Sequence, residues 1–437
     1  MELDISLIKK CYKEYKYLKD SIFNKIDSYY YGNTDTKSNF KYMKGRSNLV
    51  CNLNMLQKLV DEEAEYSLGN DITLKSKTGN DEVINIIEKE LHNLKPNHNL
   101  TLMQKYIKNM VAYEIEYVKN GEFRSRIVEP LNGYMYFDED DEPVMFLYIY
   151  NKKFSDNETK NYIRVYDDKY IYELDESFNS VLSKVPHSFK RLPVSIAHED
   201  GIDGKKTMFK TIKGLQDALE TNFSDAICDI SDNRNAILKG KNLELEEDEN
   251  GNKIPPLVRN NNFVNCEGEN ADIGWMNKNL DEPFTNTILE KNLNFIYTLT
   301  AHLDNNERMQ SNLSGIALRS RLFQLESKCK KNELAMKTLI KHRIRCLFDF
   351  LYLRDGVRYD VNDIDIIFTP NIPVDLQQIA DSLSKIPHEV MSNETRMAMI
   401  PQISNVVAEK AKIKAEKEEE MEGQEDLDKV DDENEVI

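Results

Sequence analysis

The chain has 437 residues with a formal net charge of −18, and 40% of its residues are hydrophobic, 9% aromatic and 31% charged. This length and composition favour two to four folded units and exclude a wholly disordered protein, because there is enough apolar material to form cores. No apolar run reaches the ~18 residues that a membrane helix needs, and the six cysteines never stand at a CxxC spacing, so we expect no membrane association and reduced thiols in a cytosolic setting.

The first predicted element is a helix over residues 3–30. Its apolar positions, from Ile5 to Ile26, recur with a helical period, and Gly32 with Asn33 forms a helix stop. A second helix is expected over residues 53–68, ended by Gly69, and a short strand over residues 72–74. Apolar and polar residues then alternate in the segments 111–118, 122–129, 144–150, 162–166 and 170–173, a pattern typical of strands. We therefore expect an α+β protein with a β-rich block inside a mainly helical chain.

Two further helices, over residues 207–231 and 284–303, bracket an insertion of loops and strands over residues 233–279. The first helix carries an apolar stripe at steps of three and four, which suits packing against neighbouring helices. The stripe residues that we expect to pack in this way are Met208, Ile212, Leu215, Leu219, Phe223 and Ile230.

A polar run over residues 304–312 then leads through Ser314 and Gly315 into a predicted helix that ends near residue 353. Between residues 316 and 348 this helix carries nine Lys or Arg and two acids, Glu326 and Glu333. Such charge indicates an anionic partner or an acidic neighbouring subunit, but a solvated face on an ordinary core helix explains it equally well. A strand over residues 363–368 and a helix-rich segment follow. Residues 416–437 contain twelve acids and two lysines, which predicts a disordered acidic tail.

The sequence contains no recognisable catalytic or metal-binding motif. Residues 201–207 precede a helix but miss the spacing of a phosphate-binding loop, so we expect a helix-entry turn there. His198-Glu199-Asp200 and the acidic run at residues 138–142 are better explained as solvated turns than as metal sites. There is no Gly-x-Ser-x-Gly and no activated cysteine. We therefore expect a protein that is not an enzyme and binds no metal or cofactor.

Several short motifs, taken in order and spacing, resemble the portal proteins of tailed bacteriophages, of the type found in siphophages of Gram-positive hosts. These motifs are Tyr30-Tyr31-Gly32-Asn33, Asn48-Leu49-Val50-Cys51-Asn52 (N-x-V-x-N), Tyr66-Ser67-Leu68-Gly69, Leu192-Pro193-Val194, Ser314-Gly315-Ile316-Ala317-Leu318, Asn371-Ile372-Pro373 and Met391-Ser392-Asn393-Glu394-Thr395. One departure is visible: residues 195–200 stand where such portals often have an apolar strand that ends in Asn-Asn. The junction before the helix at residue 207 is therefore expected to differ in detail.

The resemblance implies a ring of twelve subunits at one capsid vertex, with a channel for double-stranded DNA. The domains that it implies are a wing (1–205 and 316–375), two stem helices (206–232 and 281–303), a clip (233–280), a tunnel loop (304–315), a crown (376–422) and an acidic disordered tail (423–437). It also implies a virion protein that is assembled in the host cytoplasm. Its implied partners are its own copies, DNA, the large terminase subunit, the major capsid protein, the scaffold and a head–tail adaptor.

The resemblance places the DNA channel at the tunnel loop: Asp304, Asn305, Asn306, Glu307, Arg308, Met309, Gln310 and Ser311, with Ser314 and Gly315 as the hinge to the long helix. Uncharged and acidic side chains suit a channel wall, because Lys or Arg would hold DNA phosphates and stall transport. Arg308 is the exception. The basic helix is then expected to meet acidic surfaces of adjacent subunits rather than DNA. Two alternatives stay open: a helical scaffold or adaptor without a channel, and a nucleic-acid-binding protein that uses the helix 316–348.

Overall fold

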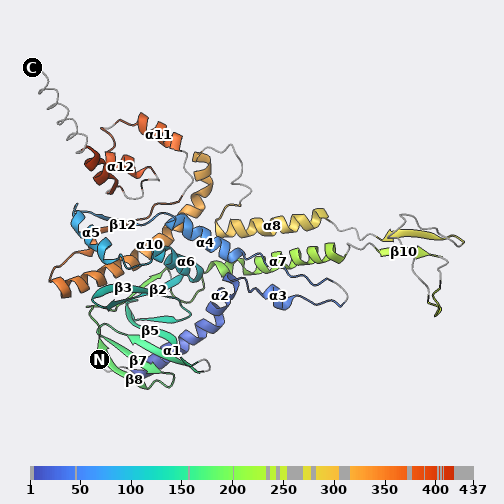
Figure 1. Cartoon of the computed structure of the whole chain (residues 1–437), viewed down its shortest axis with the longest axis horizontal. Helices are drawn as coiled ribbons and strands as arrows, with labels where there is room; N and C mark the ends of the chain where they lie inside the picture. Colours follow the sequence, from blue (N-terminus) through green and yellow to red (C-terminus); the bar gives the residue numbers. More distant parts are fainter. Residues whose placement is uncertain are drawn as a thin grey trace, which may run out of the picture. The chain divides into compact units, whose positions relative to one another are not determined.

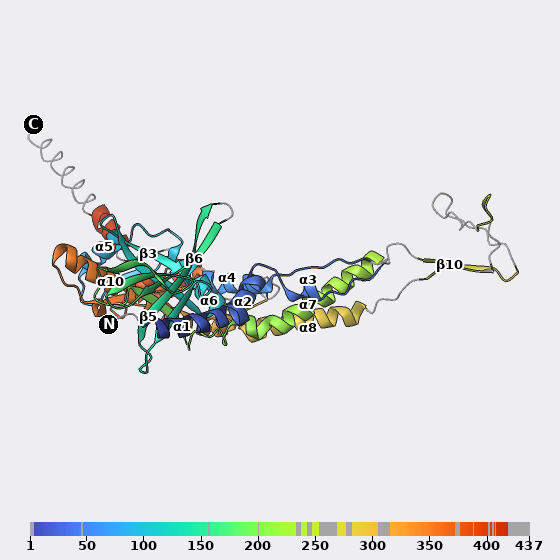
Figure 2. The ribbon, with the colours of Figure 1, turned by 90° about the horizontal axis from the view of Figure 1, so that it is seen from below.

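The computed structural model describes residues 4–44, 47–155, 158–199, 201–232, 237–242, 247–252, 269–276, 282–304, 315–371, 376–387, 389–400, 403, 406 and 408–417. Figures 1 and 2 show the ribbon from two directions. The chain divides into two compact units. The larger unit comprises residues 1–31, 54–212 and 297–437, and the smaller unit comprises residues 32–53 and 213–296.

The larger unit begins with the predicted N-terminal helix, which contains one π-helical turn. Its three parts are α1 (Ile5–Leu18), the π turn η1 (Lys19–Phe23) and α2 (Asn24–Tyr30). The Asp4 carboxylate accepts hydrogen bonds from two amides of the first turn of α1 and so caps the helix. Gly204 has φ +64°, and a Cβ there would lie 2.9 Å from Cγ2 of Ile22. Gly204 therefore permits both the predicted helix-entry turn and the close approach of that turn to η1.

Three more helices of the larger unit follow in the sequence. They are α4 (Met55–Leu68), α5 (Asp81–Glu90) and α6 (His98–Asn109). The predicted helix over 53–68 is thus confirmed to within two residues, and Gly69 is its C-cap. Helices α5 and α6 were not predicted. Leu56, Leu59 and Val60 of α4 are fully buried, which makes this helix part of the core of the unit.

Two antiparallel sheets form the predicted β-rich block. One has the order β3-β2-β9 and the other the order β4-β5-β6-β7-β8. The strands are β2 (Val111–Lys119), β3 (Glu122–Val128), β4 (Gly133–Phe137), β5 (Pro143–Ser155), β6 (Glu158–Tyr166), β7 (Tyr170–Asp175), β8 (Ser180–Pro186) and β9 (Val194–His198). Ile8, Cys11 and Tyr15 of α1 pack in one apolar cluster with side chains of the five-stranded sheet. The acidic run at residues 138–142 is the expected turn, in which the Asp138 carboxylate accepts from the amides of Asp140 and Glu142.

The long helix α10 (Gly315–Asp355) confirms the helix predicted over residues 314–353. After it come η2 (Val361–Asp363), β12 (Ile364–Ile367), α11 (Leu376–Lys385), α12 (Asn393–Ala398) and a helical stretch over residues 408–417. Strand β12 pairs antiparallel with β1 (Thr73–Ser76), so that Thr73 lies opposite Ile367. Two strands that are distant in the sequence therefore form one small sheet.

The smaller unit contains α3 (Asp35–Asn39), most of α7 (Met208–Asp232), the antiparallel pair β10 (Ile237–Lys241) and β11 (Asp272–Met276), and most of α8 (Glu282–Thr300). Helices α7 and α8 confirm the two predicted bracketing helices to within three residues at each end. They run alongside each other in both views (Figures 1 and 2). Within the part of the chain that the structure describes, no helix has both the length and the apolar character required to cross a membrane.

Candidate functional site

The predicted tunnel loop is described only at its two ends. Asp304 and Gly315 belong to the described residues, whereas Asn305, Asn306, Glu307, Arg308, Met309, Gln310, Ser311 and Ser314 lie outside them. The described part of the site therefore consists of the residues that hold the two ends of the predicted loop.

The first end of the loop is fixed where α8 stops. Ala301 adopts a left-handed conformation (φ 61°), and the amide of His302 donates to the carbonyl of Tyr297 at 3.0 Å, which closes the helix. The buried His302 ring places Nε2 3.0 Å from the Leu59 carbonyl of α4 and Nδ1 2.9 Å from the Thr300 carbonyl. Burial, helped by the charge of Lys328, lowers the pKa of His302 to about 3. The ring is therefore neutral and donates to one of the two carbonyls at a time.

A buried carboxylate joins this point to α10. Glu63 of α4 is 1% exposed, and its carboxylate accepts from Lys328 Nζ at 2.7 Å and from the Asn332 amide. Lys328 Nζ also lies 3.3 Å from the carbonyl of Thr300, so one ammonium group bridges α4 and the C-terminal end of α8, where the helix dipole favours a cation. We call Glu63, Thr300, His302, Lys328 and Asn332 the loop root.

Apolar side chains also pack beside the loop root. Leu303 packs against a buried cluster that contains Leu322, Leu325 and Cys329 of α10 and Tyr66 of α4. Leu303 precedes the predicted loop and Leu322 follows it, so the residues on both sides of the loop meet in one cluster. The described residues on either side of the predicted loop are thus held by an ion pair, hydrogen bonds and apolar packing.

Two basic residues of α10 have partners within the same chain, which the sequence did not predict. Lys328 is paired with Glu63, and the buried Arg343 donates from Nε to Glu114 at 2.8 Å and from Nη1 to Asn99 at 3.0 Å. The expectation that the basic helix meets acidic surfaces of adjacent subunits is therefore wrong for these two cations. Their carboxylates come from α4 and β2, more than 200 positions earlier in the chain, so the charge of the helix alone could not reveal them.

Glu114 and Glu116 follow each other on one side of β2 and are both buried. Burial alone would raise the pKa of Glu114, but Arg343 and His98, whose Nε2 is 2.6 Å from Oε1, outweigh it and lower that pKa. Burial and the nearby charge of Glu114 raise the pKa of Glu116 well above its usual value. Ser195 donates to Oε1 of Glu116, and Oε2 has no hydrogen-bond partner among the described residues. The pair therefore favours one ionised and one protonated carboxyl group.

The predicted stripe on α7 is divided between the interior and the surface of a single chain. Met208, Ile212 and Leu219 are buried, Leu215 and Phe223 are half-buried, and Ile230 is 59% exposed. The neighbouring side of α7 is polar and covered by an extended segment, residues 47–53, which we call the strap. Four strap amides donate to four α7 side chains: Ser47 to Asp232 (2.7 Å), Leu49 to Cys228 (3.2 Å), Cys51 to Ser224 (2.9 Å) and Leu53 to Glu220 (3.3 Å).

The spacing of these bonds follows from backbone geometry. Every second residue of an extended chain advances about 6.6 Å, and every fourth residue of a helix advances about 6 Å, so the two repeats stay in register over four bonds. The strap contains the N-x-V-x-N motif. The Asn48 amide bonds to both the N–H (2.8 Å) and the carbonyl (3.0 Å) of Met43, and the Asn52 amide donates to the carbonyl of Gly32. The two asparagines therefore fasten the ends of the strap.

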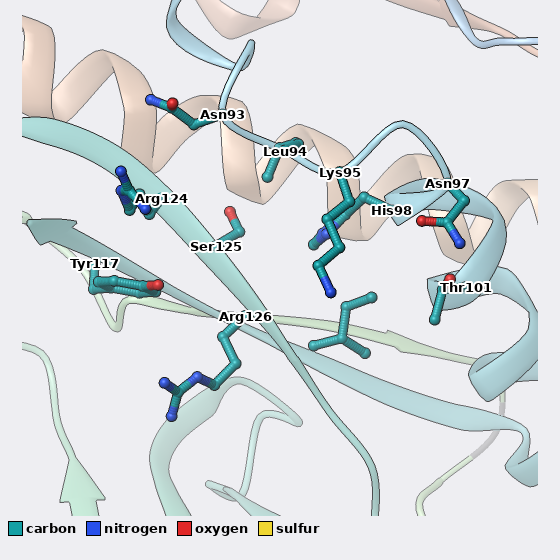
Figure 3. Close-up of a pocket in the computed structure, with 11 residues that line it drawn as sticks. Asn93, Leu94, Lys95, Asn97, His98, Thr101, Tyr117, Arg124, Ser125 and Arg126 are labelled. Atoms are coloured by element: carbon teal, nitrogen blue, oxygen red, sulfur yellow. The ribbon is translucent and has the colours of Figure 1, made fainter.

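A cavity of about 490 Å³ lies between the segment before α6 and strand β3 (Figure 3). Lys95, His98 and Thr101 come from the α6 side, and Arg124 and Arg126 come from β3. Three of these groups already have partners: His98 bonds to Glu114, Arg124 to Glu122 at 2.7 Å, and Arg126 to the Tyr148 hydroxyl at 3.4 Å. The described residues include no group of three or more His, Cys, Asp or Glu that could hold a metal ion.

The comparison with known proteins agrees with the resemblance. The model of the family "Phage portal protein, SPP1 Gp6-like" matches residues 8–423. No curated protein matches the sequence.

Solved structures of gene transfer agent (GTA) particles are similar to the chain at low identity. They are the neck of an empty particle computed with C6 symmetry (9% identity, 77% of this chain, 85% of that chain, TM-score 0.47), the virion of a native particle (10%, 77%, 87%, 0.43) and the neck of a native particle computed with C12 symmetry (10%, 78%, 88%, 0.44). Because these TM-scores are under 0.5, the assignment rests on the family model, which covers most of the sequence. The chain belongs to the SPP1 Gp6-like family of phage portal proteins.

Proposed function

We propose that the chain assembles into a ring of twelve copies at one vertex of a capsid, and that double-stranded DNA passes through its channel during packaging and ejection. Membership of the portal family supports a structural virion protein that takes part in genome packaging and in the connection of head to tail. Beyond what family membership supports, we propose the number of subunits in the ring and the DNA channel. We also propose that the large terminase subunit, the capsid protein, the scaffold and a head–tail adaptor dock on the ring. The proposal also adds a siphophage of a Gram-positive host as the source and assembly in the host cytoplasm.

The loop root is the observation that carries the channel proposal. A loop that contacts moving DNA must be able to change conformation while its two ends stay held by the rest of the protein. It therefore needs polar side chains and a fixed base. Leu303 and Leu322, on either side of the loop, lie in one buried cluster, and Lys328 joins α8 to Glu63. We therefore assign contact with DNA to residues 304–311 and the hinge to Ser314 and Gly315.

The exposed side of α7 is consistent with a channel wall. Gly214, Thr221 and Asp225 are exposed at helical spacing, with the half-buried Ala218 between them. This side offers small, neutral and acidic groups. Between residues 214 and 225 this side carries no Lys or Arg, although the exposed Lys210 lies one turn before Gly214 on the same side. The part from residue 214 to residue 225 therefore forms no persistent contacts with phosphates and would let a duplex slide. We propose that this side of α7 faces the DNA.

In this proposal the smaller unit contains the clip and most of both stem helices, whereas stem residues 206–212 and 297–303 belong to the larger unit. The larger unit contains the wing (1–205 and 316–375), the crown (376–422) and the acidic tail (423–437). One adjustment concerns residues 32–53. The resemblance assigns them to the wing, but they belong to the compact smaller unit. The strap is thus proposed as a component of the stem. No cofactor and no catalytic step is part of the proposal.

Electron microscopy of the purified protein, followed by deletion of residues 305–311, tests this function. We expect rings with a hole wide enough for a duplex, rings of normal appearance after the deletion, and loss of DNA packaging by the deletion variant. The matched control replaces the same seven residues with a Gly/Ser segment of equal length, which should restore part of the packaging if the loop acts as a polar lining. Normal packaging by the deletion variant would favour an adaptor without a channel, and a monomer under all assembly conditions would refute the ring.

A further inference from the structure

Strand β3 forms one edge of the three-stranded sheet and pairs with a neighbour on one side only. The turn before it consists of Asn120 and Gly121, which both have positive φ, so the flanking residues Lys119 and Glu122 exchange backbone hydrogen bonds. From this pair onward the direction of the backbone groups alternates along the strand. Every second residue of β3 therefore points its N–H and carbonyl groups away from β2. These residues are Phe123, Ser125 and Ile127.

The outward backbone groups of β3 are open among the described residues, none of which forms a hydrogen bond with them. An open edge of this kind is a template for a further strand. The cavity beside β3 supplies space there, with Asn93 and Leu94 across from the strand and with Ser125 and Arg126 on opposite sides of it (Figure 3). The Ser125 hydroxyl is buried and also has no partner in the described part of the chain.

The cavity beside this edge is positively charged. Its described lining includes Lys95, Arg124 and Arg126 and no Asp or Glu. Glu122, just outside the lining, pairs with Arg124 at 2.7 Å and offsets one of these three charges, so two remain. Residues two apart in a strand share a side, so both arginines lie on one side of β3 and Ser125 lies on the other. A strand that suits this edge carries acids on the arginine side and small or apolar residues on the Ser125 side.

We propose that residues 433–436 of the acidic tail of this chain add to β3 as a further strand, with Asn434 opposite Ser125. Both neighbours of Asn434 are glutamates, so they stand opposite the two arginines of β3 whichever way the added strand runs. Val436 then points to the same side as Ser125. The added strand covers an edge that could otherwise pair with other chains. This inference needs neither the ring nor the channel of the proposed function.

The charge and the attachment of the tail favour it as the occupant. Residues 416–437 contain twelve acids and two lysines, a net charge of −10. The chain enters the tail beside β1, because Lys410 pairs with Glu394, which also pairs with Lys75 at 3.5 Å. Sixteen residues beyond residue 417 span roughly 50 Å when extended, and a compact unit of about 330 residues is also about 50 Å across. Attachment to the same chain also gives the tail a high effective concentration at β3.

A disulfide between two introduced cysteines tests the position of the tail in the full chain. Ser125→Cys with Asn434→Cys should form this disulfide under mild oxidation, as measured by mass spectrometry of the digested protein. The matched control is Ser183→Cys with Asn434→Cys, because Ser183 is exposed on β8, an edge strand of the other sheet. We expect at least a tenfold lower yield for the control pair. Equal yields from the two pairs, or no disulfide at Ser125→Cys, would overturn the proposal.

Hydrogen exchange at single-residue resolution measures the added backbone bonds without introduced cysteines. Deleting residues 418–437 should accelerate exchange of the three outward amides of β3 at least tenfold. The amides of Arg124 and Arg126 bond to β2, so their exchange should not change. Unchanged outward amides, or an equal acceleration at the two arginines, would contradict strand addition by the tail.

A charge reversal separates pairing at β3 from a general attraction of the tail to basic surfaces. Glu433→Arg with Glu435→Arg should accelerate the outward amides as the deletion does. Adding Arg124→Glu and Arg126→Glu to this variant should restore their slow exchange, while β2 amides report that the fold is intact. The proposal fails if the combined variant exchanges as fast as the deletion variant. None of these measurements depends on ring formation, so their failure and the failure of the proposed function are distinguishable.

Discussion

Replacing Glu114 and Glu116 separately by glutamine should have opposite consequences, although the two residues stand two positions apart on β2. Glu114→Gln removes the carboxylate that Arg343 and His98 share, and it leaves a guanidinium group in the interior. Glu116→Gln keeps an oxygen that can accept from Ser195 and replaces a carboxyl group that is already biased toward its neutral form. Only the first change therefore removes a charge on which another buried group depends.

The expected magnitudes follow from burial and pairing. Removing one partner of a buried ion pair costs about 3–5 kcal/mol. In Glu114→Gln, Glu116 can ionise beside Arg343 and so recover part of this stability. We therefore expect Glu114→Gln to lower the free energy of unfolding by about 3 kcal/mol. Glu116→Gln should lie within about 1 kcal/mol of the wild type at pH 5. The double variant has no carboxylate left for Arg343, and it should cost more than the sum of the two single changes.

The dependence on pH has a different sign for each residue. The folded-state pKa of Glu116 is raised, so its contribution to stability is complete below its ordinary pKa and is lost as the pH rises through the folded-state value. Glu116→Gln avoids that loss, and its stability relative to the wild type should increase with pH by up to about 1.4 kcal/mol per pH unit in this window. The pKa of Glu114 is lowered, so its contribution is present above the ordinary pKa and is lost as the pH falls through the folded-state value.

Hydrogen exchange with mass spectrometry, on peptides that cover β2, measures these effects between pH 5 and pH 8. Peptides that cover residues 213–232 of α7, in the smaller unit, serve as an internal control whose exchange none of the three variants should change. Equal damage by Glu114→Gln and Glu116→Gln at every pH would refute the reasoning. It would mean that both carboxylates are ionised and that Arg343 depends on each of them.

Three further changes test the loop root, the strap and the helix-entry turn. Glu63→Gln should weaken the loop root by about 2 kcal/mol, since a hydrogen bond to a charged group is lost, and limited proteolysis within residues 305–314 should become at least several times faster. Ser224→Ala removes the acceptor of the Cys51 amide, so exchange of that amide should accelerate about tenfold for each 1.4 kcal/mol lost, whereas Ser224→Thr should preserve the bond. Gly204→Ala should lower the melting temperature more than Gly79→Ala, because both glycines have positive φ but only Gly204 has a neighbouring side chain within 3 Å of an added Cβ.

The long helices and the main strands could be predicted because their signals are local. Helix α10 and the two bracketing helices show periodic apolar positions over many turns, and their observed ends differ from the prediction by only a few residues. Helix α5 is different: Val83, Ile84 and Ile87 are buried with helical spacing, but ten residues give too few repeats to stand out. The pairing of β1 with β12 joins segments almost 300 residues apart, and periodicity carries no information about such a partner.

The strap could be recognised as a motif, but its role could not be derived from the motif alone. The sequence Asn48 to Asn52 has no periodicity, because its partners are side chains of α7 some 170 positions later. One signal was available on α7 itself. Gln216, Glu220, Ser224 and Cys228 form a row at steps of four beside the apolar stripe, and a row of this kind on an otherwise amphipathic helix indicates that backbone rather than apolar side chains covers it.

Three polar contacts fix the register of α10 in the larger unit. Lys328 binds Glu63, Arg343 binds Glu114, and Asp349 accepts from Arg191 at 2.8 Å, so three separate parts of the larger unit hold one helix. Sliding the helix by one turn would break all three contacts together, at a cost of several kcal/mol for the buried Arg343 pair alone (roughly 3–5 kcal/mol). We therefore expect α10 to keep its register when DNA passes through the proposed channel. In the proposed channel, displacement of the loop would then end at the loop root, and Lys328 and Arg343 act as internal fastenings of the helix rather than as a surface for DNA.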